Sequence, residues 1–340
     1  MSAKTGVLLI QLGTPDSPSV PDVRKYLREF LSDERVIDIS WLARTLLVNL
    51  IIAPFRAPKS AKIYQQLWTE KGSPLLYYSE NLQKKLQKVI GDDFEIELAM
   101  RYQSPSMDSV LERMRNKHYN KIIILPLFPQ YASATNGSAI DKAMKIIRKW
   151  WVIPDIKIIS QFFDDEGYIN CFVENAKKHK IEEYDHVLFS YHGLPERQVD
   201  KVYDDGKPCS DHNCENEITE DNKFCYKATC YATTRSLAER LNIPKEKYTV
   251  CFQSRLDDKW LKPFADKTVI EKAKEGAKKL LVFSPAFVAD CLETTIEIGH
   301  EYQQLLVENG GEKVQLVESL NDSDSWVNAV KNLIIAKSNQ

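Results

Sequence analysis

The sequence predicts an α/β protein made of two similar domains, each with a four-stranded parallel sheet flanked by helices. Short apolar runs that end in turn residues alternate with stretches of helical periodicity along the whole chain. This alternation is typical of parallel sheets that are covered on both faces. It occurs twice, with four apolar runs each time, and 340 residues suffice for two separate cores. We expect a first domain over residues 1–165 and a second over residues 166–340.

The first half contains four expected strands, each an aliphatic run, and six expected helices, each with apolar residues three or four positions apart. The strands cover Val7 to Leu12, Phe94 to Met100, Lys121 to Leu127 and Ile156 to Phe162. The helices cover Val20 to Leu31, Trp41 to Ile52, Ser60 to Trp68, Ser79 to Ile90, Ser106 to Lys117 and Ser138 to Trp150.

The second half repeats this order, and its last helix is a candidate for packing back on the first domain. The expected strands cover Val187 to Tyr191, Tyr248 to Gln253, Lys279 to Phe283 and Val314 to Ser319. The expected helices cover Tyr168 to His179, Ala232 to Leu241, Val269 to Ala277, Leu292 to Glu308 and Ser325 to Ile335. Two such sheets would offer a ligand cleft at the carboxyl ends of their strands.

Composition excludes some classes of function. The hydrophobic content of 43% is ordinary for a globular protein, and 46 basic against 48 acidic residues leave no basic footprint for nucleic acid. The N-terminus passes directly into a strand, so we expect no secretory signal. Together with seven cysteines, this favours a reducing compartment without disulfides.

The most apolar window, Trp41 to Phe55, is interrupted by Arg44, Asn49 and Pro54. It is too short to span a bilayer. Two interpretations stay open: a buried helix, or an apolar lip that touches a membrane or a hydrophobic ligand.

His192 lies where the strand Val187 to Tyr191 ends, before Gly193, Leu194 and Pro195. Open α/β sheets bind their ligands at this end of the strands, and imidazole titrates near neutral pH. A packing or hydrogen-bonding role is the alternative for a histidine at this position.

A series of acids follows the strand Lys279 to Phe283. On an α-helix, Asp290, Glu293, Glu297 and Glu301 would share one narrow face, with no lysine or arginine nearby to relieve their repulsion. An exposed acidic face is one interpretation. The other is a proton or metal path at the same sheet edge as His192, and this combination suits proton withdrawal coupled to a divalent metal.

Other catalytic and nucleotide-binding patterns do not occur in the sequence. It contains no G-x-S-x-G elbow, and neither a G-x-G-x-x-G nor a G-x-x-x-x-G-K-[ST] loop follows a strand. This absence argues against nucleophilic catalysis and nucleotide binding.

Four cysteines in the polar segment after His192 form a C-x4-C-x10-C-x4-C pattern. They are Cys209, Cys214, Cys225 and Cys230. Two pairs of soft ligands in a short segment indicate a zinc site or an iron–sulfur cluster, with His212 as a substitute ligand. The other cysteines, Cys171, Cys251 and Cys291, are expected to be packing residues.

Polar and aromatic residues also follow two strands of the first half. Arginine and small hydroxyls suit a carboxylate-bearing ligand, and aromatic rings suit a flat one, although interdomain packing is the alternative. These candidates are Arg101, Tyr102, Phe128, Gln130, Tyr131, Ser133 and Thr135.

Taken together and in this order, these motifs resemble ferrochelatase over nearly the whole chain. Ferrochelatase inserts ferrous iron into a porphyrin in haem synthesis. The segments that carry the resemblance are Gly6 to Pro15, Phe30 to Val36, Gly72 to Leu75, Met100 to Tyr102, Pro129 to Tyr131, Ser190 to Pro195, Phe252 to Arg255 and Asp290 to Glu301.

The resemblance implies the chelatase fold, with two Rossmann-like domains and a porphyrin between them. By carry-over, His192 and Glu293 are the catalytic pair that faces the Fe²⁺, while Asp290, Glu297 and Glu301 conduct protons or the metal. His192 either accepts a pyrrole proton or presents the iron. The implied porphyrin-binding residues are Leu12, Arg101, Tyr102, Gln130, Tyr131, Ser133, Thr135 and Trp260. Leu12 and Cys291 occupy positions that vary in the family.

The four-cysteine segment is similar to that of bacterial members with an internal [2Fe–2S] cluster, so we prefer a cluster to zinc. The expected substrate is protoporphyrin IX, with coproporphyrin III as the alternative. A non-catalytic haem or metal carrier on the same fold is a further hypothesis. The resemblance implies that the apolar lip at Trp41 to Phe55 covers the edge of the macrocycle. We expect a cytoplasmic enzyme, with the inner membrane as a peripheral contact.

Overall fold

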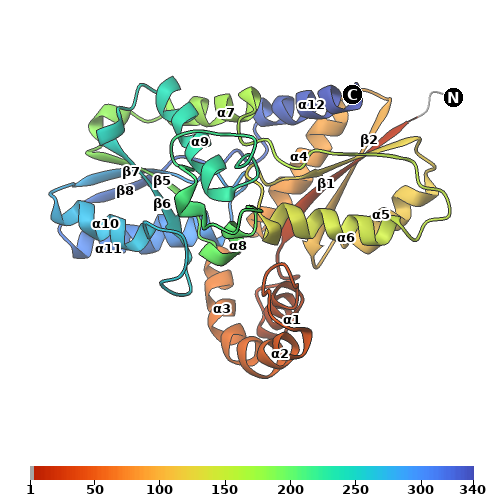
Figure 1. Ribbon diagram of the computed structural model, residues 1–340, viewed down its shortest axis with the longest axis horizontal. Helices are drawn as coiled ribbons and strands as arrows, with labels where there is room; N and C mark the ends of the chain where they lie inside the picture. The colour runs from red at the N-terminus through yellow and green to blue at the C-terminus, as the bar shows by residue number, and fades with distance from the viewer. Residues whose placement is uncertain (1–3) are drawn as a thin grey trace. The chain divides into compact units, whose positions relative to one another are not determined.

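The structure, a computed structural model, describes residues 4–340 and divides into two compact units, each built on one four-stranded parallel sheet (Figure 1). Unit 1 comprises the residues up to Phe128, Ser133–Gln161 and Asn321–Gln340, and unit 2 comprises Pro129–Ala132 and Phe162–Leu320. The predicted fold class is confirmed. The division differs from a single boundary at residue 165, because the last helix packs against a helix of unit 1.

Both sheets have the same strand order. In unit 1 the order is β2-β1-β3-β4, and in unit 2 it is β6-β5-β7-β8, with every neighbouring pair parallel. Because each central strand is the first of its unit, both units repeat one topology. The strands are β1 (Thr5–Gly13), β2 (Phe94–Tyr102), β3 (Lys121–Pro126), β4 (Asp155–Ile158), β5 (His186–His192), β6 (Tyr248–Gln253), β7 (Lys279–Phe283) and β8 (Lys313–Leu316).

Helices cover both faces of the unit 1 sheet, with α4 and α12 on one face and α5 and α6 on the other (Figure 1). Alternate residues of β1 supply the two cores: Leu8 and Ile10 pack towards α5 and α6, and Val7 and Leu9 are buried on the opposite face. The unit 1 helices are α1 (Val20–Leu31), α2 (Trp41–Leu46), α3 (Ala53–Leu67), α4 (Pro74–Val89), α5 (Met107–Asn116), α6 (Ser138–Ile147) and α12 (Asp324–Ser338), with π-helical η1 (Leu47–Ile52) and η2 (Ser133–Gly137).

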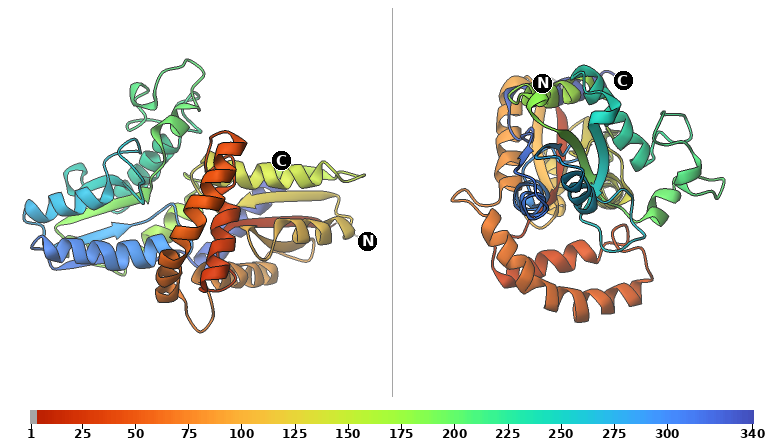
Figure 2. Two further views of the ribbon diagram at one scale, coloured as in Figure 1. Left: turned by 90° about the horizontal axis from the view of Figure 1, so that it is seen from below. Right: turned by 90° about the vertical axis from the view of Figure 1, so that its left-hand side faces the viewer.

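The helices α1 to α3 form an arm that stands off the sheet of unit 1 (Figure 2). A buried helix over Trp41 to Ile52 is wrong, because the arm leaves its apolar side chains uncovered. Trp41 is 71% exposed and Phe55 is 79% exposed. Arg44, in contrast, is buried and donates to the carbonyls of Ile37 and Ile39. The other exposed apolar residues of this arm are Leu42, Leu46, Leu50 and Ile51.

Helices also cover both faces of the unit 2 sheet. Leu188 of β5 and Val282 of β7 pack with α10, η6 and α11 on one face, while α7 and α9 contact each other on the other. The unit 2 helices are α7 (Glu166–Ala176), α8 (Glu196–Asp200), α9 (Tyr226–Arg240), α10 (Ala265–Lys274) and α11 (Gln303–Glu308), with π-helical η6 (Leu292–Tyr302) and the 3-10 turns η3 (Ile181–Glu183), η4 (Cys209–Asp211) and η5 (Lys245–Lys247).

The helix expected over Leu292 to Glu308 begins as the π-helix η6 and becomes α-helical only at Gln303. The prediction of one α-helical acidic face is therefore wrong. Hydrogen bonds in a π-helix join residues five apart, so a step of four residues stops short of a full turn. Glu297 is consequently half-buried while Glu301 is exposed.

Among residues 4–340, no helix combines the length and the apolar character that crossing a membrane requires.

Candidate active site

His192 is the last residue of β5 and stands half-buried at the carboxyl edge of the unit 2 sheet. Its Nδ1 lies 2.6 Å from the carbonyl of Gly193. A carbonyl only accepts hydrogen bonds, so Nδ1 carries a proton, and in the neutral form of the ring the lone pair is on Nε2. Nε2 has no hydrogen-bond partner within residues 4–340, which leaves it available as a base or a metal ligand.

The ring of Trp260 lies beside His192, with the two centroids 6.4 Å apart. Two backbone bonds hold it there, because Leu261 donates to Leu194 and Glu196 donates to Lys259. A Cβ on Gly193 would lie 2.8 Å from the carbonyl oxygen of Gln253 and 3.2 Å from the Trp260 ring. Only glycine permits this close packing.

Glu297, on η6, has its carboxylate held by several donors. The backbone N–H of Ser254 donates to Oε1 at 2.9 Å, and the Ser254 hydroxyl donates to Oε2. The Gln253 side chain donates to Oε2 at 3.0 Å, and the Tyr302 hydroxyl lies 3.4 Å from Oε1. Ser254 has φ +61°, a left-handed conformation that is uncommon outside glycine. The two Ser254 donors therefore meet the carboxylate only because the backbone adopts this strained conformation.

Gln253 connects three elements. Its Oε1 accepts from Ser190 of β5 at 2.7 Å, and its Nε2 donates both to Glu297 and to the backbone carbonyl of Glu293. Gln253 itself ends β6 and is buried. One amide thus fixes the acidic helix relative to the strand that carries His192.

Burial raises the pKa of Glu297 above its ordinary value, and the negative charge of Glu293 acts in the same direction. The donors Ser254 and Gln253, and the charge of His192, oppose this shift. The net effect is a carboxyl group that can take up and release a proton nearer to neutral pH. Of the other acids of the predicted series, Asp290 precedes η6 and Glu293 lies in its first turn, and both are half-buried.

Three of the four predicted cysteines come together. Cys209, Cys214 and Cys225 are buried, and their sulfurs are 3.4, 3.4 and 3.8 Å apart. We call these three residues the thiol centre. Cys230 is also buried but lies on α9, outside the thiol centre. Hydrogen bonds from Cys209 and Cys214 hold the pKa of Cys225 well below its usual value, which favours the thiolate that binds metals. A cluster of buried soft donors suits a thiophilic metal group.

Tyr203 and His212 surround the thiol centre. The Tyr203 hydroxyl lies 2.8 Å from the sulfur of Cys214, and its ring stacks on His212 at 3.8 Å. His212 lies 3.3 Å from a carboxylate oxygen of Asp205 rather than within the thiol centre. Cys171, Cys251 and Cys291 are buried outside the thiol centre, and Cys291 is the N-cap residue of η6.

In unit 1, Arg101 and Tyr102 belong to a buried network around Asp33. Arg101, Tyr102 and Ser138 all donate to one oxygen of Asp33. Burial alone would raise the pKa of Asp33, but the hydrogen bonds of Ser138 and Arg35, with the Arg101 charge, outweigh it and lower that pKa. Arg101 and Tyr102 therefore have a structural partner that the sequence did not suggest.

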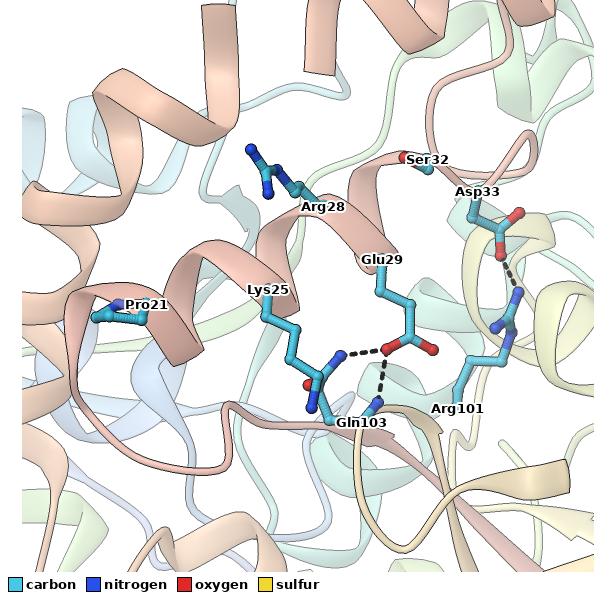
Figure 3. Close-up of a pocket in the computed structure, with 8 residues that line it drawn as sticks. All are labelled: Pro21, Lys25, Arg28, Glu29, Ser32, Asp33, Arg101 and Gln103. Atoms are coloured by element: carbon cyan, nitrogen blue, oxygen red, sulfur yellow. Dashed lines mark hydrogen bonds and ion pairs between the residues drawn. The ribbon is translucent and has the colours of Figure 1, made fainter. Parts of the chain in front are cut away.

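A charged pocket of about 580 Å³ opens beside this network (Figure 3). Arg101 reaches Asp33 on one side of it, and Gln103 donates to Glu29 on another. The residues that line it are Pro21, Lys25, Arg28, Glu29, Ser32, Asp33, Arg101 and Gln103. Apart from Arg101, none of them was a predicted ligand contact.

The remaining predicted ligand residues lie in separate places. In unit 2, Gln130 is buried and donates to Thr233 at 2.9 Å, and Tyr131 packs edge-on against Phe224. In unit 1, Ser133 accepts from Arg35, Thr135 donates to Asn136, and Leu12 is half-buried after the middle of β1.

Sequence reasoning missed the roles of Gln253, Ser254 and Tyr302. A signal was present for Gln253 and Ser254. Gln253 ends the strand that pairs in parallel with the His192 strand, and Ser254 follows it directly. The contact of Tyr302 with Glu297 depends on the π-helical winding, which no simple sequence pattern predicts.

Comparison with known proteins identifies the family. The family model described as Ferrochelatase matches residues 4–338. The ferrochelatase of Coxiella burnetii (strain CbuK_Q154) is 44% identical over 329 residues, which cover 96% of this chain and 92% of that protein. The ferrochelatase of Legionella pneumophila (strain Lens) is 44% identical over 332 residues, 97% and 98% of the two chains. This chain belongs to the ferrochelatase family.

Solved structures share the fold at low sequence identity. SirB from Bacillus subtilis with Fe³⁺ matches with a TM-score of 0.55 at 13% identity, over 98% of this chain and 95% of that one. The sirohydrochlorin chelatase SirB of Bacillus subtilis subspecies spizizenii, in complex with cobalt, gives 0.55 at 12% identity, over 99% and 96%. The chain thus has the chelatase fold. As a ferrochelatase it is a metal chelatase of haem biosynthesis that acts on a porphyrin and ferrous iron.

Ser254→Ala tests the hydrogen bonds to Glu297. Removing the hydroxyl withdraws a donor that favours the charged carboxylate, so the pKa of Glu297 should rise further. We predict that the acid limb of the plot of kcat against pH moves to higher pH by about one unit. This shift corresponds to the free energy of one hydrogen bond to a charged group. Ser236→Ala on α9 is the control, and an unmoved acid limb in Ser254→Ala would contradict the assignment.

Proposed function

We propose that this ferrochelatase inserts Fe²⁺ into protoporphyrin IX and that His192 and Glu293 are its catalytic pair. The observation that carries the proposal is the meeting of two proton-accepting groups at one sheet edge. His192 keeps a free lone pair on Nε2. Glu297, whose carboxyl group responds to the charges of both Glu293 and His192, has a raised pKa.

Insertion breaks two pyrrole N–H bonds and forms four bonds between iron and nitrogen, so two protons must leave for each Fe²⁺ that enters. In this proposal Nε2 of His192 accepts one of these protons. Glu293 accepts the other and passes it to Glu297, with Asp290 and Glu301 continuing the path towards solvent. Exposed Glu301 supports the outer end of that path. The alternative is that His192 holds the iron while the acids remove both protons.

Trp260 is the proposed porphyrin contact with the most direct support. Its half-buried indole lies beside His192, and an aromatic face suits a flat macrocycle. Arg101 and Tyr102 would act through the Asp33 network of unit 1, which holds their side chains in place. The other proposed contacts are Leu12, Gln130, Tyr131, Ser133 and Thr135.

The exposed apolar arm favours protoporphyrin IX over coproporphyrin III. Protoporphyrin carries two carboxylates and coproporphyrin carries four, so the former loses less hydration beside the apolar residues of α2 and η1. Anaerobic assays with Fe²⁺ and each porphyrin, side by side, test this choice. Faster metallation of coproporphyrin would reverse the assignment, and stoichiometric binding without turnover would favour a carrier.

His192→Ala should lower kcat by about 10² to 10⁴-fold, the usual contribution of a general base. The measurement is the rate of haem formation from protoporphyrin IX under anaerobic conditions. His300→Ala, on the exposed side of η6, is the matched control and should keep its rate. A near-normal rate in His192→Ala would remove His192 from the mechanism.

The thiol centre is the proposed site of a [2Fe–2S] cluster, with zinc as the alternative. The donor set fits, since three buried thiols already stand within 4.8 Å of one another. Cys230 on α9 would be the fourth ligand of a cluster that takes four thiolates. Such a cluster, when bound, supplies one-electron redox chemistry.

Protein purified without air should therefore be brown, with visible absorption that bleaches on reduction. Cys209→Ser should lose both the colour and the bound iron, because it removes a thiol of the centre. Cys171→Ser should lose neither, because Cys171 is buried elsewhere. A colourless protein that holds stoichiometric zinc would establish the alternative instead.

We also propose that the enzyme is cytoplasmic and that the apolar arm is its contact with the inner membrane. Trp41, Leu50 and Phe55 are each more than half exposed, and such side chains partition into the bilayer interface. We predict that the protein sediments with lipid vesicles and that Phe55→Asp weakens this binding severalfold. Equal binding by Trp151→Asp and Phe55→Asp would argue against the arm, because Trp151 is exposed outside it.

A further inference from the structure

The segment that carries the thiol centre connects to the strand that carries His192. Between the end of α8 at Asp200 and the start of α9 at Tyr226, the only helical turn is η4. This segment stands out from the rest of unit 2 (Figure 2). A metal group bound by Cys209, Cys214 and Cys225 would cross-link it and restrict its conformations.

Cys225 immediately precedes the first residue of α9. It is the N-cap of that helix, and its carbonyl accepts the N–H of Thr229 at 3.0 Å. Fixing the Cys225 sulfur therefore fixes the first turn of α9, including Tyr226. Tyr226 is buried, and its hydroxyl donates to the backbone carbonyl of His192 at 3.0 Å.

A second connection runs through α8, which begins shortly after His192. Asp200 ends this helix, and its carboxylate accepts the backbone N–H of Cys209 at 2.8 Å. The thiol centre is thus tied to the polypeptide on both sides: to His192 through Tyr226, and to the segment after His192 through Asp200. Of the two, only the Tyr226 bond reaches the catalytic residue itself.

We propose that Tyr226 is a positioning residue that couples the thiol centre to His192, so that the metal group at the thiols sets the placement of the catalytic imidazole. His192 is the last residue of β5 and pairs with a neighbouring strand on one side only, that of β6. Its backbone carbonyl accepts a hydrogen bond from the Tyr226 hydroxyl. Small displacements of a reacting group lower rates steeply. The proposal rests on a metal group being bound at the thiols, as proposed above.

Tyr226→Phe is the direct test, because it removes only the hydroxyl and keeps the ring. We expect kcat for iron insertion to fall by about five- to tenfold, the usual effect of one lost hydrogen bond, with KM for the porphyrin nearly unchanged. Metal content and visible absorption are measured in the same protein, because the Tyr226 hydroxyl also interacts with the thiol of Cys230. We expect both to stay at the wild-type level, and a loss of either would assign the effect to the centre rather than to the bond with His192. Tyr231→Phe, which removes another buried hydroxyl from α9, is the matched control and should keep its kcat.

The coupling itself is tested with four proteins: the wild type, Cys209→Ser, Tyr226→Phe and the double variant. If the centre acts on His192 through Tyr226, kcat should be severalfold lower in Cys209→Ser than in the wild type. The double variant should then have the same kcat as Tyr226→Phe. Losses that multiply in the double variant would overturn the coupling. A wild-type protein without metal at the thiols would overturn the proposed group and the coupling together.

Hydrogen–deuterium exchange supplies a readout besides activity and serves where Cys209→Ser fails to fold. Removing the metal from the wild-type protein with a chelator should raise exchange in the peptide that covers residues 187–194. In Tyr226→Phe this peptide should exchange at the higher rate with or without metal. The proposal would be contradicted if residues 187–194 of the wild type exchanged at the same rate with and without metal.

Discussion

Burial of the Glu297 carboxylate is the constraint on which the arrangement of the active site depends. A charged group that leaves water without partners is strongly destabilising, so its position demands donors. Gln253 and Ser254 supply them from the end of β6, and Tyr302 adds a hydroxyl from the same π-helix. Ser254 donates from a left-handed backbone, and Glu297 and Tyr302 lie on η6, which winds with a wider turn than an α-helix. Both departures from regular structure therefore lie at this carboxylate.

The same set of bonds explains why His192 and the acids act together. Gln253 accepts from Ser190, two residues before His192, and donates to both the backbone of Glu293 and the side chain of Glu297. Any shift of η6 would break bonds to the strand pair β5 and β6. His192 and the acidic helix are thereby held in one register, and burial raises the pKa of Glu297.

The thiol centre extends this arrangement beyond the sheet edge. Its three sulfurs organise a segment that has little regular structure, and Tyr226 carries the resulting order to the carbonyl of His192. In unit 1, Arg101 and Tyr102 are organised by Asp33, and a charged pocket lies beside them. Two units of equal topology have thus acquired different polar interiors at the carboxyl ends of their strands.

The sequence by itself determined the topology, the strand end that carries His192 and the segment that brings the cysteines together. Strand and helix periodicities are local properties, so the eight strands and the position of His192 at the end of β5 could be read from them, and the motifs were sufficient to indicate the family. Only the tertiary structure decided that η6 is a π-helix, that Cys230 stands outside the thiol centre and that Trp41 to Phe55 forms an exposed arm. It also decided that α12 returns to unit 1. These features depend on the desolvation of Glu297 and on contacts between residues distant in the chain, and such contacts leave no periodic signal in the sequence.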